Sequence, residues 1–220
     1  MHPSTQHGYS LTFDVDYPHR LSRWKTAFRV VLAAPILLLV AILVGGGRFT
    51  GATSSWGVDP WTITLPDASY YGGLVVLAPL IMIVVRRKYP RWWFDWNVAL
   101  LGLQSRIAAY LYLLREEYPS TDEQQAVRLA VRYPDASRDL SRWLPLVKWL
   151  LAIPHLIVLS VLSAASIVTV VLSWFAVVCT GRYPRSLFDF HVGVLRWHYR
   201  VIAYAFLLVT DDYPPFRLAA

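Results

Sequence analysis

An apolar stretch from Leu144 to Thr180 limits the possible folds of this chain more than any other feature. Only a lysine and a histidine interrupt it as strongly polar residues. About 20 apolar residues cross a bilayer as an α-helix, so the stretch is long enough for two short helices. We expect the bend between them at Ser163-Ala164-Ala165-Ser166. The sequence therefore predicts two membrane spans here, at about 144–162 and 164–180.

Two further apolar blocks lie in the first half of the chain, at about 27–44 and 72–85. Gly45-Gly46-Gly47 ends the first block, and a polar loop over 45–71 separates it from the second. Hydrophobic residues make up 56% of the chain and charged residues 16%, which departs from soluble averages toward a membrane protein. No cleavable signal peptide is expected, and the single cysteine excludes an internal disulfide.

Two more segments, at about 96–114 and 190–209, are apolar but carry arginine near their middle. Arginine is costly at the centre of a bilayer, which favours interfacial helices or helices packed against the protein over spans. With four spans and both termini in the cytoplasm, the external loop 45–71 holds Arg48 alone of the 21 lysines and arginines. This distribution fits the positive-inside rule and predicts a multi-pass protein of the plasma membrane.

The chain also repeats itself, which divides it into units at 1–119 and 120–220. Leu21-Ser22-Arg23-Trp24 recurs as Leu140-Ser141-Arg142-Trp143, and Tyr89-Pro90-Arg91 recurs as Tyr183-Pro184-Arg185. We therefore predict an all-α integral membrane fold of two parallel repeats. Each repeat would be a transmembrane helix hairpin followed by an amphipathic interfacial helix.

Residues 9–16 and 126–132 alternate in polarity as half-buried strands do, so they could pair as a small cytoplasmic β element. Six Tyr-Pro dipeptides fall at the boundaries of the expected segments. The residue before a proline is disfavoured in the helical conformation, so these dipeptides should lie between elements.

The second repeat carries a recognisable pattern. It comprises Arg182-Tyr183-Pro184-Arg185, Phe188-Asp189-Phe190, Arg196-Trp197, Arg200-Val201, Ala203-Tyr204 and Asp211-Asp212-Tyr213-Pro214-Pro215-Phe216. This pattern resembles the DUF4389 family of bacterial, mainly actinobacterial, membrane proteins. The resemblance extends over most of the chain, but the first repeat has Gln104-Ser105 where the second has His198-Tyr199, and it lacks the Pro-Pro-Phe ending. It implies a membrane topology and no particular chemistry.

Basic residues at span ends and on the two arginine-bearing segments are candidates for contact with anionic lipid or a partner. They are Arg86, Arg87, Lys88, Arg91, Arg106, Arg182, Arg185, Arg196 and Arg200. Other positions have counterparts in the two repeats and are given a structural role: Asp95 and Asp189 as helix N-caps, Tyr110 and Tyr204, and Trp24 and Trp143. Such basic clusters also fix topology without any further function.

His155 is the histidine inside a predicted span, where it could serve a proton path or simply pack within the protein. No catalytic constellation, metal-ligand set or cofactor motif is recognisable, and the basic residues follow membrane boundaries rather than forming a nucleic-acid-binding domain. We predict a non-enzymatic accessory or scaffold protein that engages anionic lipid and a partner membrane protein or its own copies. The alternative is a small channel or transporter that acts as an oligomer.

Overall fold

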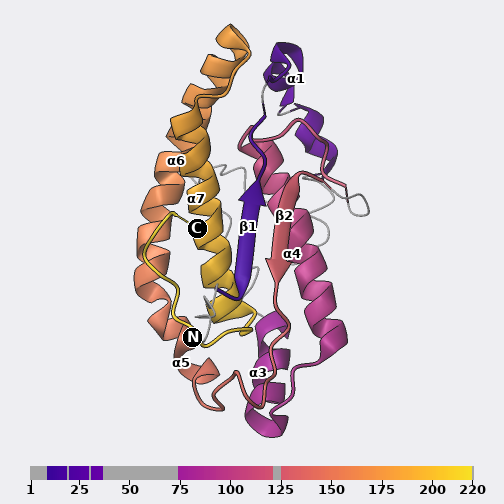
Figure 1. Cartoon of the computed structure of the whole chain (residues 1–220), viewed down its shortest axis with the longest axis vertical. Helices are drawn as coiled ribbons and strands as arrows, with labels where there is room; N and C mark the ends of the chain where they lie inside the picture. The colour runs from indigo at the N-terminus through magenta and orange to yellow at the C-terminus, as the bar shows by residue number, and fades with distance from the viewer. Residues whose placement is uncertain (1–8, 19, 30, 37–73, 121–124, 220) are drawn as a thin grey trace, which may run out of the picture.

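The computed structural model describes residues 9–18, 20–29, 31–36, 74–120 and 125–219. Helices dominate this part of the chain, and two short strands pair beside them (Figure 1). The prediction of a mostly helical fold with a small β element is therefore confirmed. All six Tyr-Pro dipeptides lie outside helices and strands, as expected.

The β element joins two segments that are far apart in the sequence. Strand β1 (Leu11–Val15) runs antiparallel to β2 (Val127–Val131), with Phe13 opposite Leu129. Alternate residues of β1 are buried, because side chains of a strand point in turn to its two faces. The pairing predicted from the alternating sequence is confirmed.

The sheet packs on two long helices, α4 (Arg91–Leu111) and α7 (Arg185–Val201). Strand β1 lies against α7 and β2 against α4. Each helix begins directly after the proline of a Tyr-Pro dipeptide, and that proline occupies the N-cap position. The prediction that Asp95 and Asp189 cap these helices is therefore wrong, since each is the fifth residue of its helix, beyond the first turn, and is exposed.

Helix α7 packs against the protein on several sides. The sequence predicted either an interfacial helix or a helix packed against the protein in this region, and the structure shows the second arrangement. Helix α7 contacts both β1 and the long helix beside it, and most of its last ten residues are buried. A π-helical turn, η2 (Ile202–Phe206), continues α7 and ends before Leu208, which has a φ of 58°. Leu113, just after α4, has a similar φ of 63°.

The long apolar stretch forms α5 (Pro145–Leu151) and α6 (Ile153–Thr180). The predicted bend at 163–166 is wrong, because α6 runs through these residues without a break. Alanine and serine fit a helix, and Ser166 Oγ donates to the carbonyl of Leu162 within it. The break lies instead at Ala152, two residues before Pro154, which sits in the first turn of α6 where a missing N–H costs little.

Helix α6 ends at Gly181, which adopts a left-handed φ of 71° and donates its N–H to the carbonyl of Val177. Its 28 residues correspond to about 42 Å, more than the hydrocarbon thickness of a bilayer. Among the described residues it is the one helix long and apolar enough to cross a membrane.

The first half is described only in part. Helix α1 (Arg23–Ala27) packs against α6, and α3 (Leu74–Arg86) packs against α5. Residues 29 and 31–36 are helical, in agreement with the start of the span predicted at 27–44. The rest of that span and the loop predicted over 45–71 lie outside the described residues.

Candidate lipid-binding site

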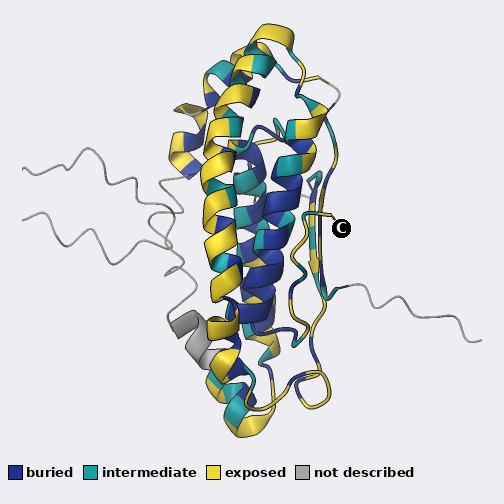
Figure 2. Ribbon diagram, turned by 90° about the vertical axis from the view of Figure 1, so that its left-hand side faces the viewer, coloured by how far each residue is buried: buried dark blue, intermediate teal, exposed yellow. Residues whose placement is uncertain are grey.

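Helices α5 and α6 expose a long apolar surface. Figure 2 shows α6 as a largely exposed ribbon in front of the buried helices. Its most exposed large side chains include Ile157, Val161 and Val168, and Val161 is 65% exposed. Contiguous apolar surface of this kind marks contact with lipid or another protein.

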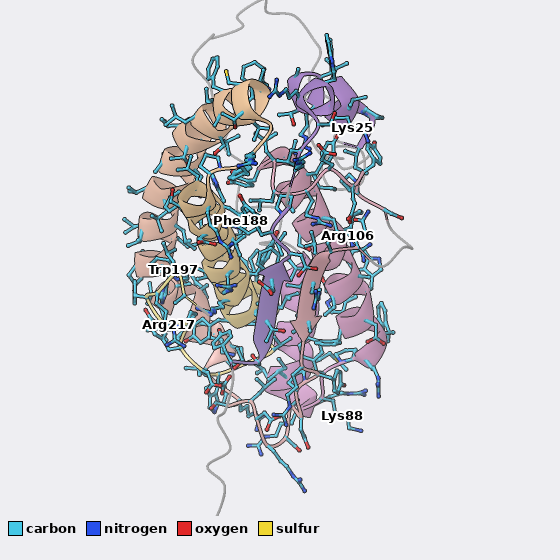
Figure 3. All side chains as sticks on the ribbon, turned by 45° about the horizontal axis from the view of Figure 1, so that its top comes forward. Lys25, Lys88, Arg106, Phe188, Trp197 and Arg217 are labelled. Atoms are coloured by element: carbon cyan, nitrogen blue, oxygen red, sulfur yellow. The ribbon has the colours of Figure 1, made fainter. Side chains whose placement is uncertain are left out.

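Exposed basic side chains gather at both ends of the elongated fold. Figure 3 shows Lys25 at one end, beside the end of α6, and Lys88 at the opposite end. Six of the predicted contact residues are exposed at these ends: Arg86, Arg87, Lys88, Arg91, Arg182 and Arg185. Their side chains are accessible to an anionic surface.

The other three predicted arginines bind the main chain of the protein itself. Arg196 Nε donates to the carbonyl of Phe13 (2.9 Å), and Arg200 Nη2 donates to that of Ala219 (3.0 Å). Arg106 Nη1 donates to the carbonyl of Ser120. Arg200 is buried, so its observed role is to hold the C-terminal segment against α7.

Tyr110 and Tyr204, predicted to have corresponding structural roles, each lie against a buried cation. The Nζ atom of Lys148 lies 5.2 Å from the centre of the Tyr204 ring and 2.7 Å from Asp211 Oδ1. The guanidinium of Arg29 lies 4.7 Å from the centre of the Tyr110 ring. The other predicted counterparts, Trp24 and Trp143, are both exposed.

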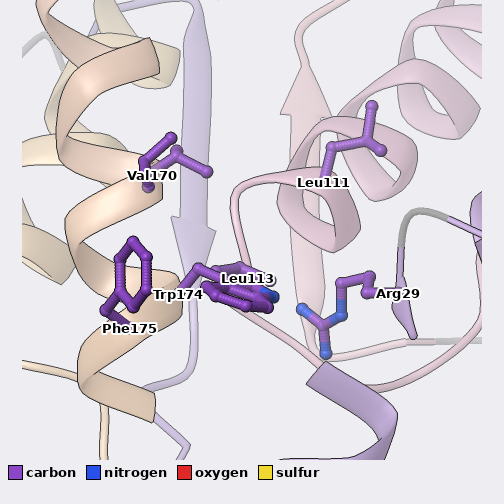
Figure 4. A pocket seen from close by; sticks show the side chains of 7 residues that line it. Arg29, Leu111, Leu113, Val170, Trp174 and Phe175 are labelled. Atoms are coloured by element: carbon purple, nitrogen blue, oxygen red, sulfur yellow. The ribbon is translucent and has the colours of Figure 1, made fainter. Parts of the chain in front are cut away.

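Arg29 faces a pocket of about 330 Å³ between α6 and the end of α4, which we call the Arg29 pocket. Its remaining lining is apolar and comprises Leu111, Leu113, Val170, Val171, Trp174 and Phe175. Figure 4 shows the guanidinium directed toward Leu113 and Trp174, with Val170 and Phe175 beyond them on α6. The pocket thus combines one cation with an apolar wall.

The guanidinium of Arg29 is only partly satisfied, although the residue is 2% exposed. Its Nη1 donates to the carbonyl of Tyr110 (3.0 Å). Its Nε and Nη2 are buried without a hydrogen-bond acceptor in the described part of the chain. Burial of a charged group without full pairing is costly, so these two donors mark a position where an anion would be stabilised.

Neighbouring side chains hold the pocket in place. Trp174 Nε1 donates to the carbonyl of Thr26 (3.1 Å), which ties α6 to α1. The hydroxyl of Tyr183 donates to the carbonyl of Tyr112 (3.1 Å), next to Leu113. Burial raises the pKa of Tyr183 to about 12, so this hydroxyl keeps its proton at neutral pH.

His155 lies in an aromatic cage rather than in an open path. Its Nδ1 accepts from Trp197 Nε1 (3.1 Å), and its ring stacks on Phe216 with centroids 3.9 Å apart. The hydroxyls of Ser160 and Ser173 donate to carbonyls of α6 itself. These contacts fit a packing role for His155 and give the channel alternative no specific support.

Arg29 lies near the start of the apolar block at 27–44 and is not among the predicted contact residues. A signal for it is present, because Arg29 and Lys148 each lie eight residues after the leucine of a Leu-Ser-Arg-Trp motif. The pocket itself could not be foreseen, since α1, α4 and α6 are brought together only by the tertiary fold.

The described residues form a mostly helical fold with one candidate membrane-crossing helix, an exposed apolar surface and a pocket that contains a buried cation. Residues 142–217 match the family described as a domain of unknown function (DUF4389). This match confirms that the second half of the chain resembles that family. No curated protein and no solved structure matches the chain.

Proposed function

We propose that this chain is a non-enzymatic, multi-pass integral protein of a bacterial plasma membrane. It engages anionic lipid and acts as an accessory or scaffold for another membrane protein or for further copies of itself. The observation that carries the proposal is the exposed apolar surface of α5 and α6 between two exposed basic ends. Apolar surface favours the hydrocarbon region, and lysine and arginine near a membrane surface favour anionic headgroups.

Both termini are proposed to lie on the cytoplasmic side. Arg196 supports a shared side, because it binds the carbonyl of Phe13 near the N-terminus and that of Leu218 near the C-terminus. The polar side chains on the outer face of the sheet, such as Asp14 and Arg128, are consistent with an aqueous environment there.

Two parallel repeats, at 1–119 and 120–220, belong to the same proposal. Tyr89 donates to the carbonyl of Leu207 (2.6 Å), and its counterpart Tyr183 donates to that of Tyr112. Ser141 N donates to Asp211 (2.5 Å), as Ser22 N donates to Glu116. Such matching contacts support the division, since unrelated halves would have no reason to share them.

The proposal is tested by isolating membranes that contain the full chain and washing them with alkaline carbonate. We expect the protein to remain in the membrane pellet, because its apolar surface is buried in lipid. The protein is then extracted in mild detergent, and the co-purifying phospholipids are compared with those of the bulk membrane. We expect phosphatidylglycerol to be enriched over phosphatidylethanolamine.

Two variants with equal loss of charge provide the control. Arg87→Gln with Lys88→Gln removes charge from one basic end, and we expect it to reduce the enrichment. Arg128→Gln with Arg132→Gln removes two exposed charges at β2 and should leave the enrichment unchanged. Release of the protein by carbonate, or equal lipid composition in all three proteins, would contradict the proposal. A stoichiometric second protein in a native mass spectrum would identify the scaffolded partner.

A further inference from the structure

We propose that the Arg29 pocket is a binding site for one molecule of an anionic phospholipid. Its phosphodiester would lie on the guanidinium of Arg29, and one acyl chain would lie along α6. The inference rests on the proposed function in requiring that the chain lies in a membrane. It differs from surface attraction because it specifies one site and one bound molecule.

The two N–H donors of Arg29 that have no acceptor in the described chain have the geometry that a phosphodiester requires. Nε and Nη2 form one edge of the planar guanidinium, so their two N–H bonds point in nearly the same direction. Two unesterified phosphate oxygens match this edge in a bidentate arrangement. The opposite part of the group is already fixed, because Nη1 binds the carbonyl of Tyr110 and the plane lies near the Tyr110 ring.

The remaining lining fits the acyl chain of the same molecule. Leu111 and Leu113 form one wall, and Val171, Trp174 and Phe175 come from α6 opposite. Phe175 is 56% exposed and Val171 is 50% exposed, so the pocket opens onto the apolar surface of α6. A chain leaving the pocket would therefore continue along that surface, where the other lipids are expected.

Charge favours an anionic lipid over a zwitterionic one. Among the described residues no carboxylate forms an ion pair with Arg29, so a phosphate bound to Nε and Nη2 would be its direct anionic partner. Exposed Arg23 and Lys25 lie on the adjacent helix α1, where they would attract a headgroup without its own ammonium. Phosphatidylglycerol meets both requirements and serves as the probe.

The test measures lipid bound to the full chain by native mass spectrometry. Protein in mild detergent is stripped of lipid and titrated with phosphatidylglycerol, phosphatidylethanolamine, palmitate or inorganic phosphate. We expect one phosphatidylglycerol to bind before any other lipid adduct and to persist when the detergent is exchanged. The assignment to a phospholipid would be overturned if palmitate bound before phosphatidylglycerol. It would also be overturned if inorganic phosphate bound to the protein as tightly as phosphatidylglycerol does.

Three variants locate the site. Arg29→Gln removes the charge and the bidentate edge, and we expect the affinity for the first phosphatidylglycerol to fall at least tenfold. Arg29→Lys keeps the charge without the planar edge and should give an intermediate loss. Val171→Trp leaves Arg29 intact and fills the acyl path, so it should also abolish the first adduct.

Arg128→Gln with Arg132→Gln is the matched control, because both exposed charges lie at β2 and neither lines the Arg29 pocket. It lowers surface charge outside the pocket and should retain the single bound lipid. Thermal unfolding of each variant in detergent identifies any that fail to fold. Retention of the stoichiometric lipid by folded Arg29→Gln and Val171→Trp would overturn the inference. Carbonate-resistant membrane insertion of the same proteins would show that the proposed function stands independently.

Discussion

Two buried cations occupy corresponding places in the two halves, but they are neutralised differently. Lys148 is fully buried, forms an ion pair with Asp211 and donates to the carbonyl of Thr210 (2.7 Å). Arg29 binds one carbonyl and retains two donors without an acceptor in the described chain. The charge of Lys148 is therefore neutralised by a carboxylate of the protein, whereas Arg29 has two N–H donors left for an anion from outside the protein.

Replacing Lys148 with methionine should destabilise the fold, because it leaves Asp211 and the carbonyl of Thr210 without their cation. Breaking one partner of a buried pair costs about 3 kcal/mol or more. The expected result is a marked drop in the midpoint of denaturation of the purified protein in detergent. Arg128→Gln breaks the exposed pair with Asp16 and should leave the midpoint almost unchanged. Equal midpoints for the two variants would show that the buried pair contributes little.

Residue-scale prediction succeeded where a local pattern determines the outcome. The alternating residues around Phe13 and Leu129 were sufficient to predict the strand pairing. The roles of Arg196 and Arg200 could not be predicted, because their partners are main-chain carbonyls of residues that lie far away in the sequence. From the sequence alone, an arginine in an apolar segment could bind either a lipid phosphate or a main-chain carbonyl oxygen.

At the scale of elements, one glycine determines how closely the C-terminal segment approaches α7. A Cβ atom at Gly193 would lie 2.8 Å from Leu218 Cβ and 3.1 Å from the carbonyl oxygen of Leu218. Gly102 in α4 has no such neighbour within 4 Å. The first glycine is therefore required by packing, whereas the second is not.

Alanine at these two positions should have opposite effects. Gly102→Ala should stabilise the fold by roughly 0.5–1 kcal/mol, since alanine is the better helix former. Gly193→Ala should displace the C-terminal segment and expose the bond after Arg217 to trypsin. A local loss of about 1 kcal/mol corresponds to roughly fivefold faster cleavage, measured from the loss of the last three residues by intact mass. The same cleavage rate in both variants would contradict this packing role.

The boundaries of the elements were predicted unevenly for physical reasons. Tyr-Pro dipeptides determine helix starts locally, so the regions of α4 and α7 were anticipated. The bend predicted at 163–166 was wrong because it was inferred from the span length rather than from a helix-breaking residue. Gly181 and Pro154 are the residues that determine where α6 ends and begins.

For the whole molecule, the single cysteine provides a direct test of orientation. Cys179 is exposed near the end of α6, beside the basic residues of that end. With both termini in the cytoplasm, we expect a membrane-impermeant maleimide to label it in inside-out vesicles and not in intact cells. The extent of labelling is read from the mass shift of the intact protein.

Ser54→Cys combined with Cys179→Ala is the control for this measurement. Position 54 lies in the loop predicted to be external, so it should react in intact cells and be protected in inside-out vesicles. Labelling of Cys179 from outside intact cells would reverse the proposed orientation. Reaction of both positions from the same side would exclude the predicted arrangement of the loop and the termini.

The exchange of contacts between the halves also limits how the protein can be divided. Strand β1 covers α7, α1 packs against α6, and Tyr89 binds the main chain beyond η2. The segment that matches the family, 142–217, therefore does not include β1 and α1, which cover parts of its helices α7 and α6. Expressed alone, it would expose the surface around Tyr199 that Phe13 now covers.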